Sequence, residues 1–65
     1  MAQSFGGRLR ALRRKLGLTQ SEVATVLDCS PPRISEWERS VRTPKDLTQE
    51  AIIARLKKRG ARRRR

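Results

Sequence analysis

Histidine and tyrosine are absent from this sequence, and cysteine occurs only once, as Cys29. A single cysteine cannot form an internal disulfide, and a structural zinc site needs several cysteine or histidine ligands, so both are excluded. The same shortage leaves no pair of nucleophile and base of the kind that covalent catalysis needs. The sequence therefore predicts a protein that is not an enzyme and that holds no metal or cofactor.

Long apolar runs are also missing, and no stretch approaches the length of a membrane span or of the apolar part of a signal peptide. We therefore expect a cytoplasmic protein that does not use a membrane. With 65 residues the chain is expected to form one small domain with a modest core. Domains of this size often gain stability from self-association.

Acidic residues are few, at 6 Asp+Glu against 17 Lys+Arg, which gives a formal net charge of +11. Seven of the bases and no acid fall in residues 57–65, so residues 1–56 carry ten bases and six acids. This distribution indicates a moderately basic domain followed by a basic arm. It favours a nucleic acid as partner, although an anionic membrane or an acidic protein would also attract this charge.

Residues 1–7 are interpreted as a flexible leader, after which two helices are expected. The first begins at Arg8 and ends at Gly17, a residue that readily adopts the left-handed conformation found after helices. Its apolar positions are Leu9, Leu12 and Leu16. Thr19 and Glu22 have the spacing of a capping box, which starts the second helix. The apolar positions of that helix are Val23, Ala24 and Leu27.

A tight turn and a third helix follow. Asp28 tolerates the left-handed conformation that such a turn requires. Ser30 caps the third helix, and Pro31 occupies its first position, where no intrahelical partner for an N–H group is needed. Ile34 and Trp37 supply its apolar face.

A fourth helix is expected to begin near Asp46 or Thr48 and to stop at Gly60. Its apolar residues are Leu47, Ile52, Ile53 and Leu56. The sequence thus predicts an all-α fold, a compact domain of four to five helices over residues 8–59. Residues 60–65 are expected to form a disordered basic tail, because like charges repel one another and cannot be buried.

Two short helices joined by a tight turn can place the second helix in the major groove of DNA. With Ile34 and Trp37 turned inward, the opposite face at the leading end of the third helix points away from the core. That face carries Pro31, Pro32, Arg33 and Glu36.

The stretch LGLTQSEVATVLDCSPPRISEWERSVRTP resembles the helix-turn-helix of the lambda-repressor/Cro (Xre-like) family. The similarity spans roughly residues 8–56 without a gap. Each motif is weak by itself, but together in this order they make the resemblance specific. This sequence departs from the family at Asp28 and Ser40, two turn positions that usually hold glycine. The adjacent prolines, Pro31 and Pro32, are also unusual, because they remove two backbone donors and two polar side chains.

The resemblance implies roles for individual residues. The positions that match base-contacting residues of the family are Pro31, Pro32, Arg33 and Glu36. The positions that match phosphate-contacting residues are Thr19, Gln20, Ser30, Arg39 and Arg42. Arg13 and Glu38 match an ion pair that joins the first helix to the third.

The base-contacting candidates have different chemistry. Arg33 can form a bidentate bond with guanine, the commonest specific contact that arginine makes. Glu36 can accept a hydrogen bond from cytosine, or it can be held by Arg33 three residues away. Pro31 and Pro32 start the helix, and any base contact from them is apolar, for example with a thymine methyl group.

The basic arm has three interpretations. It solubilises the chain, it adds phosphate affinity that is independent of sequence, or it enters a minor groove. We favour the second interpretation. The last bases of the arm are Arg62, Arg63, Arg64 and Arg65.

Taken together, the sequence predicts a DNA-binding transcriptional regulator of bacterial or phage type, a repressor that binds double-stranded operator DNA in the nucleoid. Relatives of this type bind paired half-sites as homodimers. The apolar residues Ile52, Ile53 and Leu56 are the candidate dimer surface. The alternatives are an antitoxin component of a toxin–antitoxin operon and a basic module that binds RNA or the ribosome.

Overall fold

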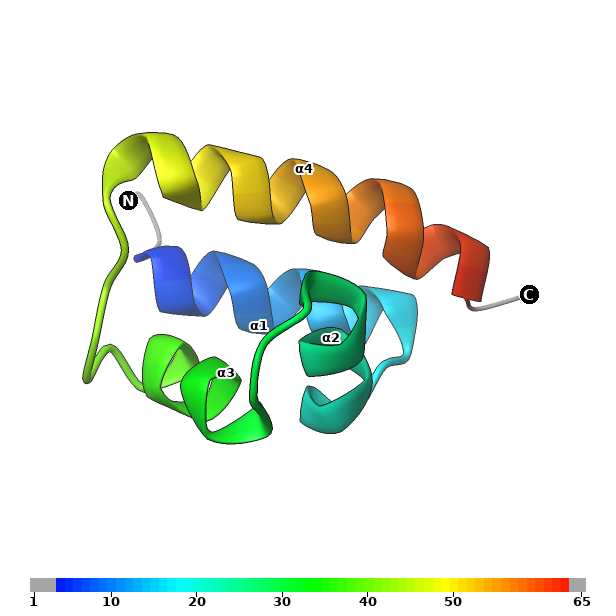
Figure 1. Ribbon diagram of the computed structural model, residues 1–65, viewed down its shortest axis with the longest axis horizontal. Helices are drawn as coiled ribbons and strands as arrows, with labels where there is room; N and C mark the ends of the chain where they lie inside the picture. Colours follow the sequence, from blue (N-terminus) through cyan, green and yellow to red (C-terminus); the bar gives the residue numbers. More distant parts are fainter. Residues whose placement is uncertain (1–3, 64–65) are drawn as a thin grey trace.

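The computed structural model describes residues 4–63, and over that range the fold is all-helical, as the sequence predicts. The helices are α1 (Phe5–Leu16), α2 (Gln20–Leu27), α3 (Pro31–Glu38) and α4 (Asp46–Arg63). In Figure 1, α1 and α4 run side by side in the same direction, and α3 lies on the other side of α1 from α4. Helices α1 and α2 each pack against both α3 and α4.

The first helix starts earlier than expected, so the predicted leader over residues 1–7 is wrong for its last part. Ser4 is the N-cap of α1, and its hydroxyl accepts a hydrogen bond from the backbone N–H of Gly7 at 3.1 Å. Helix propensity did not predict this turn, because glycine is a poor helix former. Gly6 has a packing role: a Cβ there would overlap the carbonyl oxygen of Trp37 and lie 2.9 Å from that of Glu38.

The last helix continues past Gly60, so the predicted stop at that residue is wrong. Gly60 is buried inside α4, and a Cβ on it would lie 2.8 Å from Leu16 Cδ1 and 3.2 Å from Leu18 Cδ1. The missing side chain therefore lets α4 approach the end of α1. The helix extends to residue 63, so the predicted disordered tail is wrong for residues 61–63, and residues 64 and 65 lie outside the described residues.

The capping box predicted for α2 is present in both halves. Thr19 Oγ1 accepts from the N–H of Glu22 at 3.1 Å, and the N–H of Thr19 donates to Glu22 Oε1 at 2.8 Å. Asp28 and Ser40, which stand where the family usually has glycine, both adopt positive φ, at 57° and 60°. These two turn positions thus keep the left-handed backbone without glycine.

The core is formed by one apolar cluster that all four helices share. Leu9, Val23, Ile34 and Leu56 are its largest fully buried side chains. Phe5 meets the ring of Trp37 edge-on, with 5.9 Å between ring centroids, and so joins the start of α1 to the last turn of α3. Over residues 4–63, no helix combines the length and the apolar character needed to cross a membrane.

The predicted dimer surface on α4 is wrong for two of its three residues. Ile53 and Leu56 are buried in the core of a single chain, and Ile52 is half-buried against it. The exposed large apolar side chains are instead Val41, at 62% exposure, and Leu47, at 87%. They lie in the loop before α4 and in its first turn.

Candidate nucleic-acid interface

A three-residue turn, residues 28–30, connects α2 to α3. It begins with the left-handed Asp28, and the N–H of Cys29 then bonds to the carbonyl of Ala24 at 2.9 Å. Ser30 is the N-cap of α3, but its side chain makes no capping hydrogen bond. Its carbonyl accepts from the N–H of Arg33 at 3.0 Å. The turn therefore sets α3 at an angle to α2, as a helix-turn-helix requires.

The two faces of α3 differ as the sequence predicts. Ile34 is fully buried and Trp37 is half-buried, whereas Pro31, Pro32 and Arg33 are exposed at the leading end of the helix. The prolines have no N–H group, so the first two positions of α3 offer no backbone donor to a phosphate. Side chains, above all that of Arg33, must supply the polar contacts of this helix end.

Glu36 forms an ion pair with Arg42, a partner that was not predicted for it from the sequence. Its Oε1 lies 3.6 Å from Nε of Arg42, and its carbonyl accepts from the N–H groups of Val41 at 2.9 Å and of Arg42 at 3.4 Å. Arg33 takes part in no ion pair among residues 4–60. The hypothesis that Arg33 holds Glu36 is therefore wrong, and Arg33 is the exposed base of α3 whose charge is not engaged by that carboxylate.

Arg33, Glu36 and Arg42 share an open cleft of about 540 Å³ between α3 and the loop that follows it. Thr43 and Thr48 also line this cleft. The two threonines were not predicted from the sequence, because only the fold brings the loop with Thr43 and the first turn of α4 with Thr48 beside α3. Their hydroxyl groups add hydrogen-bonding capacity next to two guanidinium groups.

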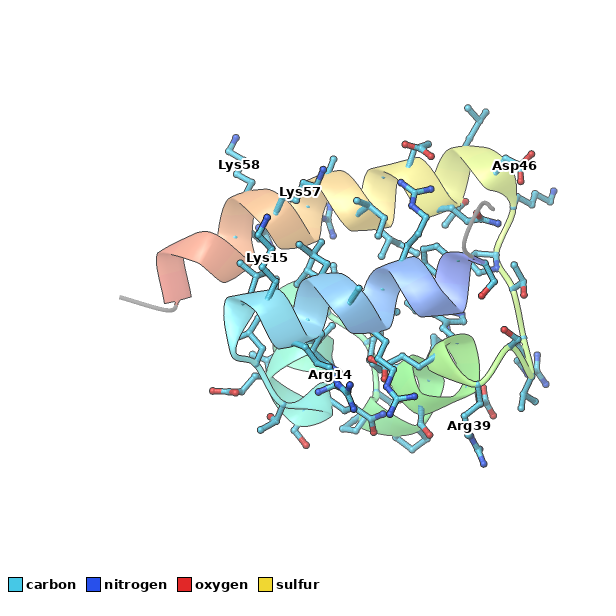
Figure 2. The ribbon with its side chains drawn as sticks, turned by 180° about the vertical axis from the view of Figure 1, so that it is seen from behind. Arg14, Lys15, Arg39, Asp46, Lys57 and Lys58 are labelled. Atoms are coloured by element: carbon cyan, nitrogen blue, oxygen red, sulfur yellow. The ribbon has the colours of Figure 1, made fainter. Side chains whose placement is uncertain are left out.

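Further basic side chains lie directly after α3 and on α1. Figure 2 shows Arg14 and Arg39 on the side of α1 that faces α2 and α3. Arg39 is exposed directly after α3, and it flanks a cleft of about 280 Å³ together with Arg10 of α1 and Gln20 of α2. Arg10 was not predicted as a site residue, although its place three residues before Arg13 puts both on one face of the helix.

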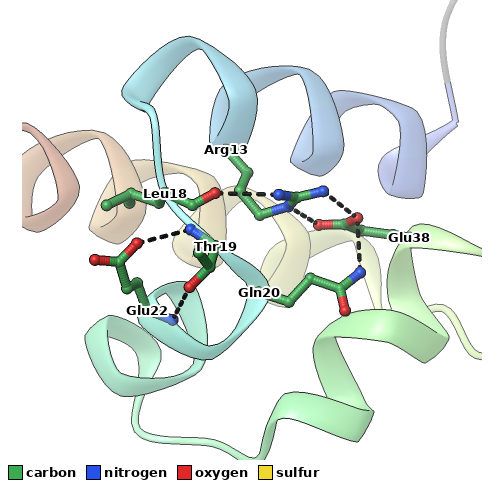
Figure 3. Close-up of polar contacts among 6 residues, drawn as sticks. All are labelled: Arg13, Leu18, Thr19, Gln20, Glu22 and Glu38. Atoms are coloured by element: carbon green, nitrogen blue, oxygen red, sulfur yellow. Dashed lines mark hydrogen bonds and ion pairs between the residues drawn. The ribbon is translucent and has the colours of Figure 1, made fainter.

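Arg13 and Glu38 form the ion pair that the resemblance implied (Figure 3). The guanidinium donates through Nε to Glu38 Oε2 at 2.7 Å and through Nη2 to Oε1 at 3.1 Å. A third bond runs from Arg13 Nη1 to the carbonyl of Leu18 at 3.1 Å. The Glu38 side chain is 4% exposed and that of Arg13 is 16% exposed, so solvent screens the pair little. The pair joins α1 to α3.

Gln20 is attached to the same carboxylate. Its Nε2 donates to Glu38 Oε1 at 3.2 Å, which fixes the orientation of the amide (Figure 3). An amide nitrogen carries two hydrogens, so one remains to donate to a phosphate oxygen. Thr19 uses its hydroxyl oxygen and its N–H in the capping box, and its hydroxyl hydrogen also remains for a donor contact.

Cys29 lies beside this surface without contributing a reactive thiolate. Burial raises the pKa of its thiol, and the carboxylate of Asp28 raises it further, while the guanidinium of Arg33 acts in the opposite direction. The protonated thiol is a poor nucleophile. Cys29 also packs partly against the core.

Comparison with known protein families agrees with this geometry. The helix-turn-helix family matches residues 9–59, most of the chain and all of the segment that carries the turn. No curated protein and no solved structure matches the chain significantly. Together with the arrangement of α2 and α3, the family match shows that the chain belongs to the Xre/lambda-repressor-like helix-turn-helix family of DNA-binding regulators.

Proposed function

We propose that this protein is a transcriptional repressor that binds a specific site on double-stranded DNA by placing α3 in the major groove. The observation that carries the proposal is the leading end of α3, where Arg33 projects into solvent from a helix whose other face is fixed in the core. A recognition helix contacts base edges with its leading end.

Arg33 is the main base-contacting residue in this proposal. Its fork of donors matches the O6 and N7 atoms of guanine. Glu36 can accept from a cytosine while it stays near Arg42, because only its Oε1 faces that guanidinium, at 3.6 Å, and a carboxylate has further acceptor sites. Pro31 and Pro32 contribute apolar contact with a thymine methyl group.

The phosphate contacts surround α3 on two sides. Thr19 and Gln20 supply side-chain donors at the start of α2, whose N-terminal N–H groups also favour an anion. Ser30 supplies an uncommitted hydroxyl, and Arg39 and Arg42 supply charge after α3. Contacts of this kind position a protein on the duplex and leave the choice of sequence to the base contacts.

We further propose that the protein binds as a homodimer on a palindromic or nearly palindromic operator. Half-site centres are then about one helical turn apart, ~34–36 Å. The candidates for the dimer surface are two exposed apolar residues, Val41 in the loop before α4 and Leu47 in its first turn, since Ile53 and Leu56 are buried. A regulator of this type acts in the cytoplasm at the nucleoid, where it blocks polymerase by occupying its operator.

Selection of bound duplexes from a random pool tests this proposal. Enrichment of one short motif is expected, and two-fold symmetry in the motif would report the dimer as well. A pool that shows no enrichment after several rounds contradicts sequence-specific binding. Equal or tighter binding of structured RNA would instead support the module that acts on RNA or the ribosome.

An antitoxin role is a special case of the same proposal, because antitoxins of this family also bind their own operators. The gene next to this one distinguishes the two cases. If it encodes a small toxin that this protein binds and inhibits, the regulator is an antitoxin.

A further inference from the structure

Three exposed lysines form a second basic surface, which we call the lysine patch: Lys15 at the end of α1, and Lys57 and Lys58 on α4. Figure 2 shows them together where the end of α1 lies beside the second half of α4, on the far side of α1 from Arg39 and α3. These two segments meet because buried Gly60 allows α4 to contact Leu16 and Leu18.

The charge of the lysine patch is not neutralised within the fold. Helix α1 contains five bases and no acid, and residues 51–63 of α4 contain six bases and no acid. The acids of α4, Asp46 and Glu50, lie in its first two turns. Among residues 4–60, the ion pairs use Arg8, Arg13 and Arg42, and none uses a lysine.

Stabilisation of helix ends explains only part of this charge. A cation in the last turn of a helix interacts favourably with the helix dipole, and Lys15 occupies such a position in α1. The effect falls off beyond the last turn. Helix α4 ends at Arg63, so Lys57 and Lys58 lie too far from its end to serve this purpose.

The chemistry of the patch fits the phosphate backbone of a duplex better than a protein or a membrane. The centres of protein interfaces are rich in aromatic residues and poor in lysine. Helices that lie on membranes combine lysine with large apolar side chains. Among residues 4–60 the exposed large apolar residues, Val41 and Leu47, lie in the loop before α4 and in its first turn, away from the patch. Lysine is a flexible point charge that contacts phosphates without reading bases.

The patch also lies on the far side of α1 from α3, so the two basic surfaces do not share one face (Figure 2). The molecule measures 30 × 24 × 19 Å, and charges are screened over about 8–10 Å at physiological salt. We propose that the lysine patch binds the backbone of a second duplex segment, so that one protein molecule bridges two segments of DNA. The proposal rests on the function proposed above, in which α3 binds the first segment.

A bridging assay with the full chain tests this inference. A biotinylated duplex that contains the selected site is fixed to beads, protein is added below saturation, and capture of a second, fluorescent duplex of unrelated sequence is measured. Wild type is expected to capture the second duplex, and added salt is expected to abolish capture before it releases the protein from its specific site.

Two variants with equal net charge separate the two surfaces. K15Q/K57Q/K58Q removes three charges from the lysine patch, and R33Q/R39Q/R42Q removes three from the side of α3. The lysine variant is expected to bind the fixed duplex within about threefold of wild type, because the patch is screened from that site, but to lose capture at least about tenfold. Circular dichroism and thermal melting check that each variant is folded.

Each remaining outcome has a defined meaning. The inference is overturned if the lysine variant still captures the second duplex, or if wild type does not capture it. It is also overturned if wild type captures anionic vesicles or structured RNA in preference to the second duplex. Binding of the fixed duplex that survives in R33Q/R39Q/R42Q contradicts the proposed function instead. The two proposals therefore fail in different measurements.

Discussion

The carboxylate of Glu38 accepts both hydrogen bonds of a bidentate pair from Arg13, at 2.7 and 3.1 Å, and so fixes the end of α3 to the last turn of α1. The same carboxylate orients Gln20 at the start of α2. One buried charge thus links the base-contacting helix to a phosphate-contacting residue. Loss of this link is expected to disturb both the stability and the shape of the binding surface.

We expect Glu38→Ala to lower the free energy of unfolding by about 3 kcal/mol or more, because it leaves the charge of Arg13 without its partner in a largely buried site. Urea denaturation measures the change. Glu50→Ala is the matched control, because it breaks an exposed ion pair between Glu50 and Arg8, whose side chains are 69% and 41% exposed, respectively. It should lower the free energy of unfolding by less than about 0.5 kcal/mol. Equal losses in the two variants would contradict the role of the pair.

Gly6 and Gly7 make a second matched comparison, since both are helical and adjacent. Gly6→Ala is expected to destabilise the protein by about 2 kcal/mol or more, because the new Cβ overlaps the backbone carbonyl of Trp37 and forces α1 away from α3. Gly7 faces a shallow surface groove beside Arg10. Gly7→Ala should therefore stabilise by about 0.5–1 kcal/mol through helix propensity. If the Tm shifts in the same direction for both variants, the close packing of Gly6 against the end of α3 is refuted.

Asp28 holds a positive φ of 57° and places a negative charge at the end of α2. Both features are unfavourable, the first for any residue with a Cβ and the second because of the helix dipole. Asp28→Gly should relieve both and raise stability by about 1 kcal/mol, or about 4–8 °C in Tm for a domain of this size. Asp28→Asn should gain only the smaller part due to charge. If Asp28→Asn raises the stability as much as Asp28→Gly does, the backbone at residue 28 is not strained.

The thiol of Cys29 provides a pH-dependent test of the local charges. Folding raises its pKa through burial and through Asp28, so alkylation by iodoacetamide should begin at higher pH in the folded protein than in urea. Asp28→Asn should lower the midpoint of the pH–rate profile, and Arg33→Ala should raise it, because the guanidinium favours the thiolate. Shifts in the same direction would be inconsistent with this electrostatic arrangement.

The sequence predicted the features that depend on near neighbours. The capping box of Thr19 and Glu22 spans one helical turn, and the left-handed turn at Asp28 depends on a single residue. The two faces of α3 follow from the spacing of Ile34 and Trp37. Such patterns are local, so the identity of the residues largely decides them.

The errors concern contacts between distant segments. Gly6 and Gly60 look like helix breakers, but each permits a close approach that only the folded packing creates. The apolar stripe of α4 looked like a dimer surface, because the sequence does not say that α1 and α2 already cover Ile53 and Leu56. The partner of Glu36 was missed because it comes from the loop after α3.

Arg33, at the leading end of α3, is expected to contribute sequence selectivity on duplex DNA. The direct measurement is competition binding of wild type and Arg33→Ala against the selected duplex, a scrambled duplex and structured RNA. We predict that wild type prefers the selected duplex by about 10³-fold or more. Arg33→Ala should lose about 1–3 kcal/mol on that duplex and relax the preference at one base position. Equal competition by all three nucleic acids, with no change on Arg33→Ala, would contradict sequence-selective DNA binding through Arg33.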